Sequence, residues 1–349
     1  MPSATRPATA TDWVASLDPW PEEFGLGRIH TLLAALGDPQ RAFPSIHVVG
    51  TNGKSTATRT IAELLRAEGL RAGAFTSPHV SGWHERLDCD PASFERAIAR
   101  VRSSAEPLGA TQFEVLTAAA LADFAEAGVD VAVVEAGLGG RLDATNVVDA
   151  PVVQLTNVAL EHTEVLGETP EEIAKEKLAV AHSARVVVAS DNTFEHLVPP
   201  NAKLVLGGAR EAAEAFLERR AEAVVDVQLP GRLERRGDEV WDGAHTPEAV
   251  DWLLARLPAR DHVLCVSILG DKRVDEMLVR LSRAGSTLIA TKSSNPRSLP
   301  ASELAALATP HFQDVQTVAS PRKALTRARA AGRPVIVTGS LYLLADLYA

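Results

Sequence analysis

Short apolar runs alternate with longer amphipathic stretches along the first two thirds of the chain. The runs that predict buried strands are 45–49, 71–75, 129–134, 151–156 and 185–189. The stretches with helical spacing or helix-start signals are 29–36, 57–68, 90–106, 112–126 and 169–177. Strand–helix alternation of this kind predicts an α/β fold with a mainly parallel sheet and helices on both of its faces.

A second alternation follows a Leu-Pro-Gly-Arg turn. Its predicted strands are 240–241, 263–267, 286–291, 315–318 and 334–338. Because 349 residues exceed one ordinary core, two domains are expected. We assign 1–228 to the first domain, 229–234 to a linker and 235–349 to a second domain with a smaller open sheet. Within the first domain, 191–222 shows the weakest pattern and is interpreted as a reduced subdomain or a spacer.

A tight loop joins the strand 45–49 to the helix that follows it. Its residues are Gly50, Thr51, Asn52, Gly53, Lys54, Ser55 and Thr56. Two glycines let backbone N–H groups turn inward, the helix N-terminus attracts anions, and Lys54 adds a full positive charge. A hydroxyl after the lysine can bind Mg²⁺. The first glycine of the full phosphate-loop pattern is replaced by Val48, yet a lysine has no purpose in an ordinary structural turn, so the loop predicts nucleotide binding.

Further polar residues end other predicted strands, at the sheet edge where ligands gather in such folds. They are Ser77, Glu135, Asn146 and His162. A carboxylate such as Glu135 after a buried strand needs a counter-charge, so it is either salt-bridged or bound to a metal. With His162 and a hydroxyl it could form a Mg²⁺ site, although structural roles for both residues stay open.

Three other positions are less clearly marked by the sequence pattern: Lys177, Arg232 and the turn 242–245. On pattern alone, Lys177 is a solvated helix residue. Arg232 and the turn Asp242-Gly-Ala-His245 open the second domain, where they either reach a nucleotide or shape a hinge.

Composition narrows the class of protein further. The net charge of −10 argues against non-specific binding to nucleic acid or to an anionic membrane. Two cysteines cannot build a disulfide framework, and no apolar run is long enough to span a bilayer. We therefore expect a cytoplasmic protein with neither a nucleic-acid nor a membrane partner.

Several motifs together resemble the folylpolyglutamate synthase / dihydrofolate synthase family, within the Mur-type ATP-dependent amide ligases. They include GLGRI (25–29), HVVGTNGKST (47–56), TSPH (76–79), VEAGLGGRLDATN (134–146), IAKEKLAV (173–180), LPGRLE (229–234) and DGAHTPEA (242–249). The resemblance implies an N-terminal ATPase domain and a Rossmann-like C-terminal domain. It also implies that ATP phosphorylates a carboxylate of dihydropteroate or a folate, and that L-glutamate then displaces phosphate.

The resemblance implies roles for individual residues as well. Residues 50–56 would hold ATP with help from Arg232, Asp242 and His245. Mg²⁺ would be held by Ser55 or Thr56, Ser77, Glu135 and His162. Lys177 would be carbamylated. The catalytic residues would be Lys54, Lys177 and His162. The residues that would meet the acid substrate are Ser77, Pro78, His79, Arg86, Arg141, Asp143 and Asn146.

The sequence departs from the family pattern in a few places. Ser55 replaces a glycine, Glu161 an aspartate, Leu178 an alanine and Thr246 an asparagine. The family segment between the lysine helix and the linker is reduced to roughly 207–218. Two alternatives therefore accompany the main hypothesis: a ligase of the same chemistry with a non-folate acid or amine, and an inactive nucleotide-binding homologue. We expect a monomer.

Overall fold

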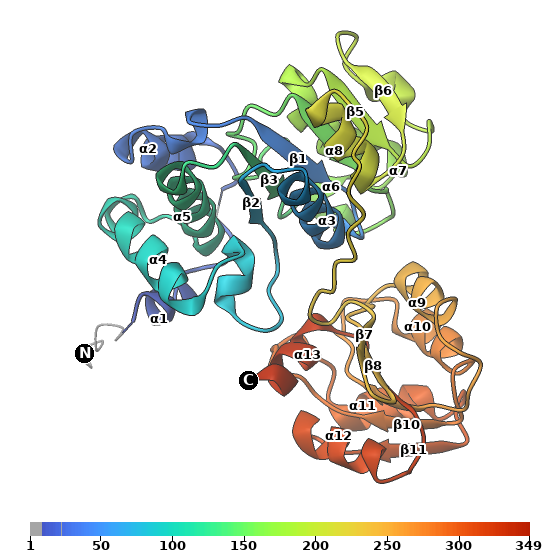
Figure 1. Cartoon of the computed structure of the whole chain (residues 1–349). Helices are drawn as coiled ribbons and strands as arrows, with labels where there is room; N and C mark the ends of the chain where they lie inside the picture. The colour runs from blue at the N-terminus through green and yellow to red at the C-terminus, as the bar shows by residue number, and fades with distance from the viewer. Residues whose placement is uncertain (1–8, 22) are drawn as a thin grey trace, which may run out of the picture. The chain divides into compact units, whose positions relative to one another are not determined.

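The computed structural model describes residues 9–21 and 23–349. Its contacts divide these residues into two compact units. The first unit holds the described residues up to His79 together with Trp83–Val227. The second holds Gln228–Ala349 and a short excursion, Val80–Gly82. Figure 1 shows the units in different parts of the colour range.

The first unit is built on a six-stranded sheet with the order β2-β3-β1-β4-β5-β6, in which all neighbours pair in parallel. The strands are β1 Ser45–Val49, β2 Ala72–Phe75, β3 Val131–Glu135, β4 Val152–Leu155, β5 Val186–Ala189 and β6 Lys203–Leu206. The strands β1, β2, β3 and β4 are buried along their whole length, which explains their nearly continuous apolar sequence.

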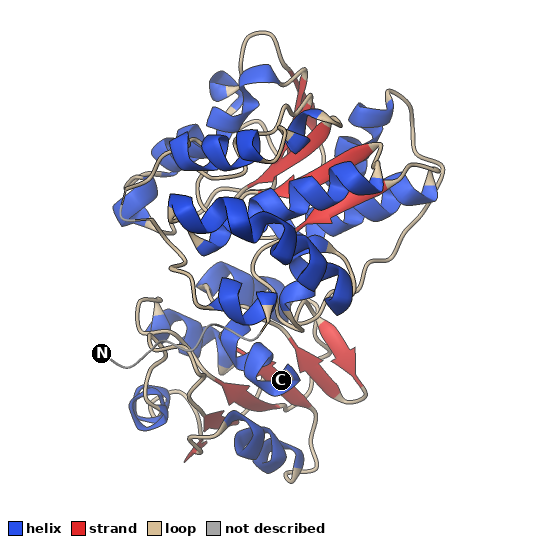
Figure 2. Ribbon diagram, turned by 90° about the vertical axis from the view of Figure 1, so that its left-hand side faces the viewer, coloured by secondary structure: helices blue, strands red, loops and turns tan. Residues whose placement is uncertain are grey.

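Helices cover both faces of this sheet, as Figures 1 and 2 show. One apolar core includes side chains of α1 Ala10–Ala15, α2 Gly27–Ala35, α4 Pro91–Ala105 and α5 Gln112–Ala127. The other core includes α3 Lys54–Ala67 and α8 Ala209–Leu217. The short helices α6 Thr163–Leu166 and α7 Pro170–Leu178 follow the carboxyl end of β4. The predicted fold class is thus confirmed for this unit.

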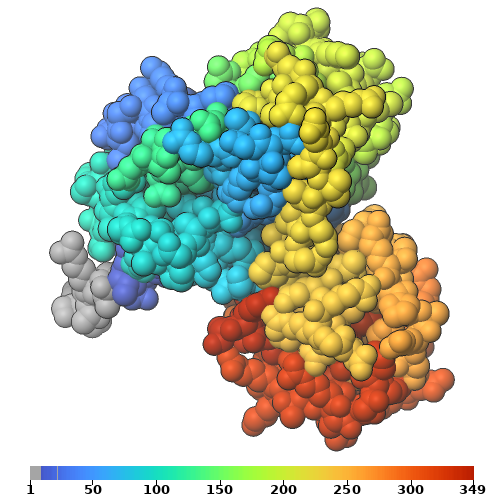
Figure 3. Space-filling model, in the orientation of Figure 1, coloured from blue at the N-terminus to red at the C-terminus, as the bar shows by residue number. Residues whose placement is uncertain are grey.

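The segment 191–222 differs from the subdomain or spacer that the sequence suggested. It supplies β6, which extends the sheet beside β5, and α8, which packs against α3. Beyond α8 the chain is fastened to α3, because the carboxylate of Glu68 accepts the backbone N–H groups of Glu222 and Ala223 at 2.7 Å each. Figure 3 shows this stretch as yellow atoms on the outside of the first unit.

The second unit is also an open α/β sheet, with the order β11-β10-β9-β12-β8-β7. Its strands are β7 Glu234–Arg236, β8 Glu239–Trp241, β9 Val263–Val266, β10 Thr287–Ala290, β11 Asp314–Thr317 and β12 Val335–Thr338. Its helices are α9 Pro247–Leu254, α10 Val274–Leu281, α11 Ala301–Ala308, α12 Pro321–Arg329 and α13 Leu341–Tyr348. The sheet is not smaller than the first, because β7, which was not predicted, adds an antiparallel edge strand. Among the described residues, no helix combines the length and the apolar character needed to cross a bilayer.

Candidate active site

The loop between β1 and α3 has the backbone of an anion-binding turn. Gly50 has φ +146° and Gly53 has φ +81°, conformations that side-chain-bearing residues rarely adopt. A Cβ on Gly50 would overlap the hydroxyl of Thr156. Gly53 is the N-cap of α3, so the first turn of that helix directs N–H groups to the loop. Lys54 Nζ donates to the carbonyl oxygens of Gly50 and Thr51, at 3.0 and 3.2 Å.

Residues after β4 hold this phosphate loop in shape. Asn157 accepts the N–H of Thr51 at its backbone oxygen and the N–H of Asn52 at Oδ1, both at 3.0 Å. The Thr156 hydroxyl donates to the Asn52 carbonyl at 2.7 Å. Thr156 and Asn157 were not among the predicted site residues; their place at the end of a predicted strand is the signal that could have identified them.

Three of the predicted metal ligands lie together beside the loop. The Ser55 hydroxyl donates to Glu135 Oε1 at 3.1 Å, and the Ser77 N–H donates to Glu135 Oε2 at 2.9 Å. Glu135 ends β3 directly beside Val48 and is 1% exposed. A buried carboxylate next to two hydroxyl-bearing residues presents the oxygen donors that Mg²⁺ prefers.

The other two predicted metal ligands are placed differently. Thr56 is exposed on the first turn of α3. His162 precedes α6 as its N-cap with φ +50°, and its ring nitrogens lie 3.9 Å from carboxylate oxygens of Glu161 and Glu164. No group of three histidine, cysteine or acidic side chains within the described residues could hold a metal alone. A cation at Glu135 would therefore depend on hydroxyl and phosphate oxygens.

Lys177 is buried in this site, which corrects the solvated position that its helix pattern suggested. It is 4% exposed, and its Nζ donates to the Gly50 carbonyl at 2.9 Å. Burial, reinforced by the nearby charge of Lys54, lowers the pKa of the Lys177 amine to about 7. The carboxylates of Glu161 and Asp143 act in the opposite direction but more weakly.

The glycine-rich loop after β3 packs on the end of α7. A Cβ on Gly140 would meet the backbone of Lys177, so only glycine permits this approach. Within the loop, Asp143 accepts the N–H groups of Leu138 and Thr145 at 2.7 and 3.0 Å. Burial raises the pKa of the Asp143 carboxyl, against the effect of these hydrogen bonds.

The remaining side chains of this loop are tied to neighbouring elements. Arg141 Nε donates to Glu176 at 2.9 Å. The side chain of Asn146 donates to the Arg141 carbonyl at 3.0 Å, so Asn146 supports the loop.

A hollow with roughly 810 Å³ of empty space, open water at its mouth included, lies beside this loop. Its lining combines apolar and aromatic side chains with carboxylates: Pro19, Trp20, Pro21, Phe24, Gly25, Thr111, Phe113, Glu114, Leu138, Arg141, Leu142, Asp143, Ala144, Val165, Leu166 and Glu176. Of the predicted substrate residues, Arg141 and Asp143 line it. Trp20 and Phe24 were missed because 19–25 shows no periodic pattern. Phe113 was missed because it lies on the strongly apolar helix α5, where an aromatic residue indicates core packing.

The predicted substrate residues in the loop after β2 form a separate cluster. Arg86 Nε donates to His79 Nδ1 at 2.9 Å, and the His79 ring lies 4.4 Å from the ring of Trp83. Burial, with the positive charge of Arg86, lowers the pKa of His79 to about 3. His79 is thus a neutral acceptor for Arg86. This loop holds four of the predicted residues. Ser77 is hydrogen-bonded to Glu135, His79 and Arg86 are hydrogen-bonded to each other, and Pro78 lies between Ser77 and His79 in the chain.

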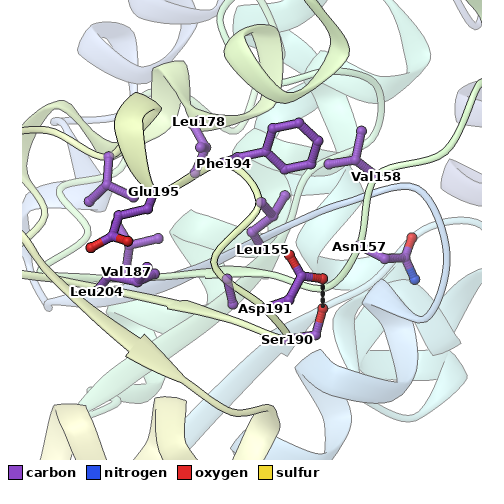
Figure 4. A pocket seen from close by; sticks show the side chains of 12 residues that line it. Leu155, Asn157, Val158, Leu178, Val187, Ser190, Asp191, Phe194, Glu195 and Leu204 are labelled. Carbon is purple, nitrogen blue, oxygen red and sulfur yellow. Dashed lines mark hydrogen bonds between the residues drawn. The ribbon is translucent and has the colours of Figure 1, made fainter. Parts of the chain in front are cut away.

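A second, mostly apolar pocket lies at the carboxyl ends of β4 and β5 (Figure 4). Leu155, Leu178 and Phe194 are among its apolar walls, and Asp191 accepts a hydrogen bond from Ser190 there at 3.3 Å. None of the predicted site residues lines this pocket.

The second unit brings its three candidates together. Asp242 is 5% exposed and accepts the N–H groups of Leu233 and Ala244 at 2.7 and 2.9 Å. Burial raises its pKa, while the charges of Arg232 and His245 oppose that shift. Nδ1 of His245 lies 2.8 Å from the Gly243 carbonyl oxygen. These contacts show that the turn is structurally fixed by Asp242.

Comparison with known proteins identifies the class to which this fold and phosphate site belong. The model of the Mur ligase middle domain matches residues 48–225, and that of the Mur ligase glutamate ligase domain matches residues 231–341. The chain is therefore an ATP-dependent ligase of the Mur type.

Similar proteins define the family within that class. A dihydrofolate synthase/folylpolyglutamate synthase of Mycobacterium tuberculosis is 33% identical over 89% of this chain and 85% of its own length. The structure of folylpolyglutamate synthase from the same organism, complexed with ADP, superimposes with a TM-score of 0.85 at 30% identity, covering 95% of this chain and 96% of that one. The chain belongs to the folylpolyglutamate synthase / dihydrofolate synthase family.

A third relative shows which ligands such a fold accepts. The structure of a bifunctional folylpolyglutamate synthase/dihydrofolate synthase with Mn, AMPPNP and L-glutamate bound has a TM-score of 0.82 at 26% identity and 97% coverage of both chains. The alignment with the Mycobacterium enzyme runs over 414 positions, more than the 349 residues of this chain. That relative therefore carries segments that this chain lacks.

Proposed function

We propose that this ligase joins L-glutamate to dihydropteroate, to folates, or to both, through an acyl phosphate. The observation that carries the proposal is the proximity of the Lys54 phosphate loop to the oxygen cluster around Glu135. A carboxylate is a poor electrophile until one of its oxygens is phosphorylated, and two anions meet only where positive charge neutralises them. The site provides that charge through Lys54 and the first turn of α3.

Each residue of the site has a role in this proposal. Lys54 and the N–H groups of 53–56 hold the phosphates of ATP. The oxygens of Ser55, Ser77 and Glu135 hold a divalent cation. His162, directly before α6, is a further proposed ligand of this cation. When bound, the cation neutralises charge on the transferring phosphoryl group.

We propose that Lys177 reacts with carbon dioxide to form a carbamate. The amine nitrogen attacks the carbon of CO₂ and forms an N–C bond, while the π electron pair of one C=O bond moves to its oxygen. The nitrogen then gives a proton to solvent water, which turns a potential cation into an anion. Only a neutral amine can do this, and the pKa of about 7 makes a large neutral fraction available at physiological pH. The anion would also remove the repulsion between Lys177 and Lys54.

The acid substrate is proposed to enter the hollow beside the glycine-rich loop. The rings of Trp20, Phe24 and Phe113 offer stacking surfaces for a planar heterocycle. Asp143 offers a carboxylate to the N–H groups that a pterin ring carries. His79 and Arg86 remain candidates for contacts outside the hollow, and Arg232, Asp242 and His245 for contacts with the nucleotide. A monomeric, cytoplasmic enzyme without a nucleic-acid partner completes the proposal.

A non-folate acid is the second candidate substrate, because the Mycobacterium relative carries segments that this chain lacks. Phosphate release from Mg·ATP and L-glutamate, measured separately with dihydropteroate and tetrahydrofolate, distinguishes the two, with Lys54→Ala as the inactive control. Turnover with either pterin supports the main proposal. ATP binding without turnover on both would favour another acid.

A further inference from the structure

A chain of three buried side chains runs from the centre of the sheet to the wall of the hollow. His47 lies in the middle of β1 and is 1% exposed. Its Nε2 is 2.8 Å from the Thr145 hydroxyl oxygen, and Thr145 is fully buried. The same hydroxyl contacts Oδ1 of Asp143, which lines the hollow. His47 is therefore two hydrogen bonds away from the space proposed for the substrate.

The hydrogen-bond inventory fixes the direction of this chain. A threonine hydroxyl has one proton. Asp143 accepts the backbone N–H groups of Leu138 and Thr145, which favours its ionised form, and an ionised carboxylate can only accept, so the Thr145 proton points to Asp143. The Thr145 oxygen must then accept from His47, which places the imidazole proton on Nε2. Burial, with the nearby His182, lowers the pKa of His47 to about 3, so the ring is neutral and Nδ1 carries no proton.

The arrangement leaves one atom unpartnered. His47 Nδ1 is buried without a hydrogen-bond partner among the described residues. An apolar side chain would avoid that cost, and the paired positions Val134 and Val153 on the neighbouring strands are apolar. The benefit of a histidine at this place is therefore the bond that Nε2 makes to Thr145.

We propose that His47 is a positioning residue for substrate recognition: it orients the Thr145 hydroxyl, which in turn orients the Asp143 carboxylate toward a ligand in the hollow. The ligand class is a planar heterocycle with N–H donors, held between aromatic rings and a carboxylate. This inference rests on the proposed function and names one determinant of its acid-substrate site. His47 acts on affinity for the acid, and it takes no part in phosphoryl transfer.

Two matched pairs of variants test the chain. His47→Gln keeps an N–H donor near the position of Nε2, whereas His47→Leu removes it. Thr145→Ser keeps the hydroxyl, whereas Thr145→Val replaces it with a methyl group of similar size. The readouts are the KM values for dihydropteroate or tetrahydrofolate, for Mg·ATP and for L-glutamate, together with kcat and the melting temperature.

We expect His47→Leu and Thr145→Val each to raise the KM for the pterin substrate about tenfold, the equivalent of about 1.4 kcal/mol. The KM values for Mg·ATP and glutamate should change less than twofold, as should all constants of His47→Gln and Thr145→Ser. The double variant should be no worse than the worse single variant, because both remove the same interaction.

Several outcomes would overturn the inference. One such outcome is a KM for the pterin substrate that is the same in Thr145→Val as in the wild type. Another is a parallel rise in the KM for Mg·ATP, which marks a general structural defect. If His47→Leu fails to fold, the Thr145 pair decides alone, because valine has nearly the shape and volume of the native threonine. A wild-type enzyme that turns over no pterin rejects the proposed function and this inference together. Normal wild-type turnover with insensitive variants rejects the inference alone.

Discussion

The ammonium groups of Lys54 and Lys177 both donate to the carbonyl oxygen of Gly50, at 3.0 and 2.9 Å. Lys54 belongs to the phosphate loop, while Lys177 arrives from the last turn of α7. Burial lowers the pKa of the Lys177 amine, and repulsion by the neighbouring Lys54 cation lowers it further. This relationship links the phosphate loop to the proposed carbamate.

The lowered pKa of Lys177 predicts a pH dependence of stability. The unfolded chain keeps this lysine protonated up to its ordinary value of 10.5, whereas the folded chain loses the proton near pH 7. Between these values the unfolded state binds more protons, so stability rises with pH, by at most about 1.4 kcal/mol per unit. Urea unfolding of wild type and Lys177→Met in CO₂-free buffer should show that only the wild type gains stability from this group. Parallel curves for the two proteins would contradict the prediction.

The Ser55–Glu135 contact predicts a dependence of metal affinity on one hydroxyl. Ser55→Ala should weaken Mn²⁺ binding in the presence of AMPPNP about tenfold, because an oxygen donor next to the carboxylate is lost. Ser55→Thr retains the hydroxyl and should bind Mn²⁺ within about threefold of the wild type. Electron paramagnetic resonance titration of free Mn²⁺ measures both values. Equal affinity of Ser55→Ala and the wild type would exclude Ser55 from the metal site.

The places of the loop 50–56 and of Ser55, Ser77 and Glu135 in the fold could be predicted from the sequence, because they depend on strand ends that apolar patterns reveal. The sequence did not predict β6 and β7. The strand Lys203–Leu206 is exposed at both ends, and Glu234–Arg236 is wholly charged, so neither has the alternation that marks a half-buried strand. Both lie at a sheet edge and neither contains a buried residue, so burial imposes no pattern on them.

Other features depend on contacts between distant segments. Lys177 follows a capping box on a charged helix, and its burial depends on the approach of Gly140 and Gly50. The bond between His47 and Thr145 joins residues 98 positions apart. No periodicity in the sequence encodes either contact.

The two glycines of the phosphate loop should differ in their tolerance of a side chain. Gly50→Ala would overlap Thr156 and strain the backbone, whereas Gly53→Ala meets open space and bears only the conformational cost. We expect Gly50→Ala to be less stable than Gly53→Ala by about 1–3 kcal/mol in urea unfolding. Gly50→Ala/Thr156→Ala serves as the companion variant, and it should recover part of the loss because the hydroxyl oxygen that the new Cβ overlaps is removed. Equal stability of the two single variants would contradict this account of the loop.

The central claim is that the acid substrate is activated as an acyl phosphate. Dihydropteroate labelled with ¹⁸O in both carboxylate oxygens should be incubated with Mg·ATP and L-glutamate, and the released phosphate analysed by mass spectrometry. The account predicts that each phosphate carries one ¹⁸O atom, because the substrate oxygen attacked by the γ-phosphorus leaves with it when glutamate forms the amide. Amide product accompanied by unlabelled phosphate would contradict the claim.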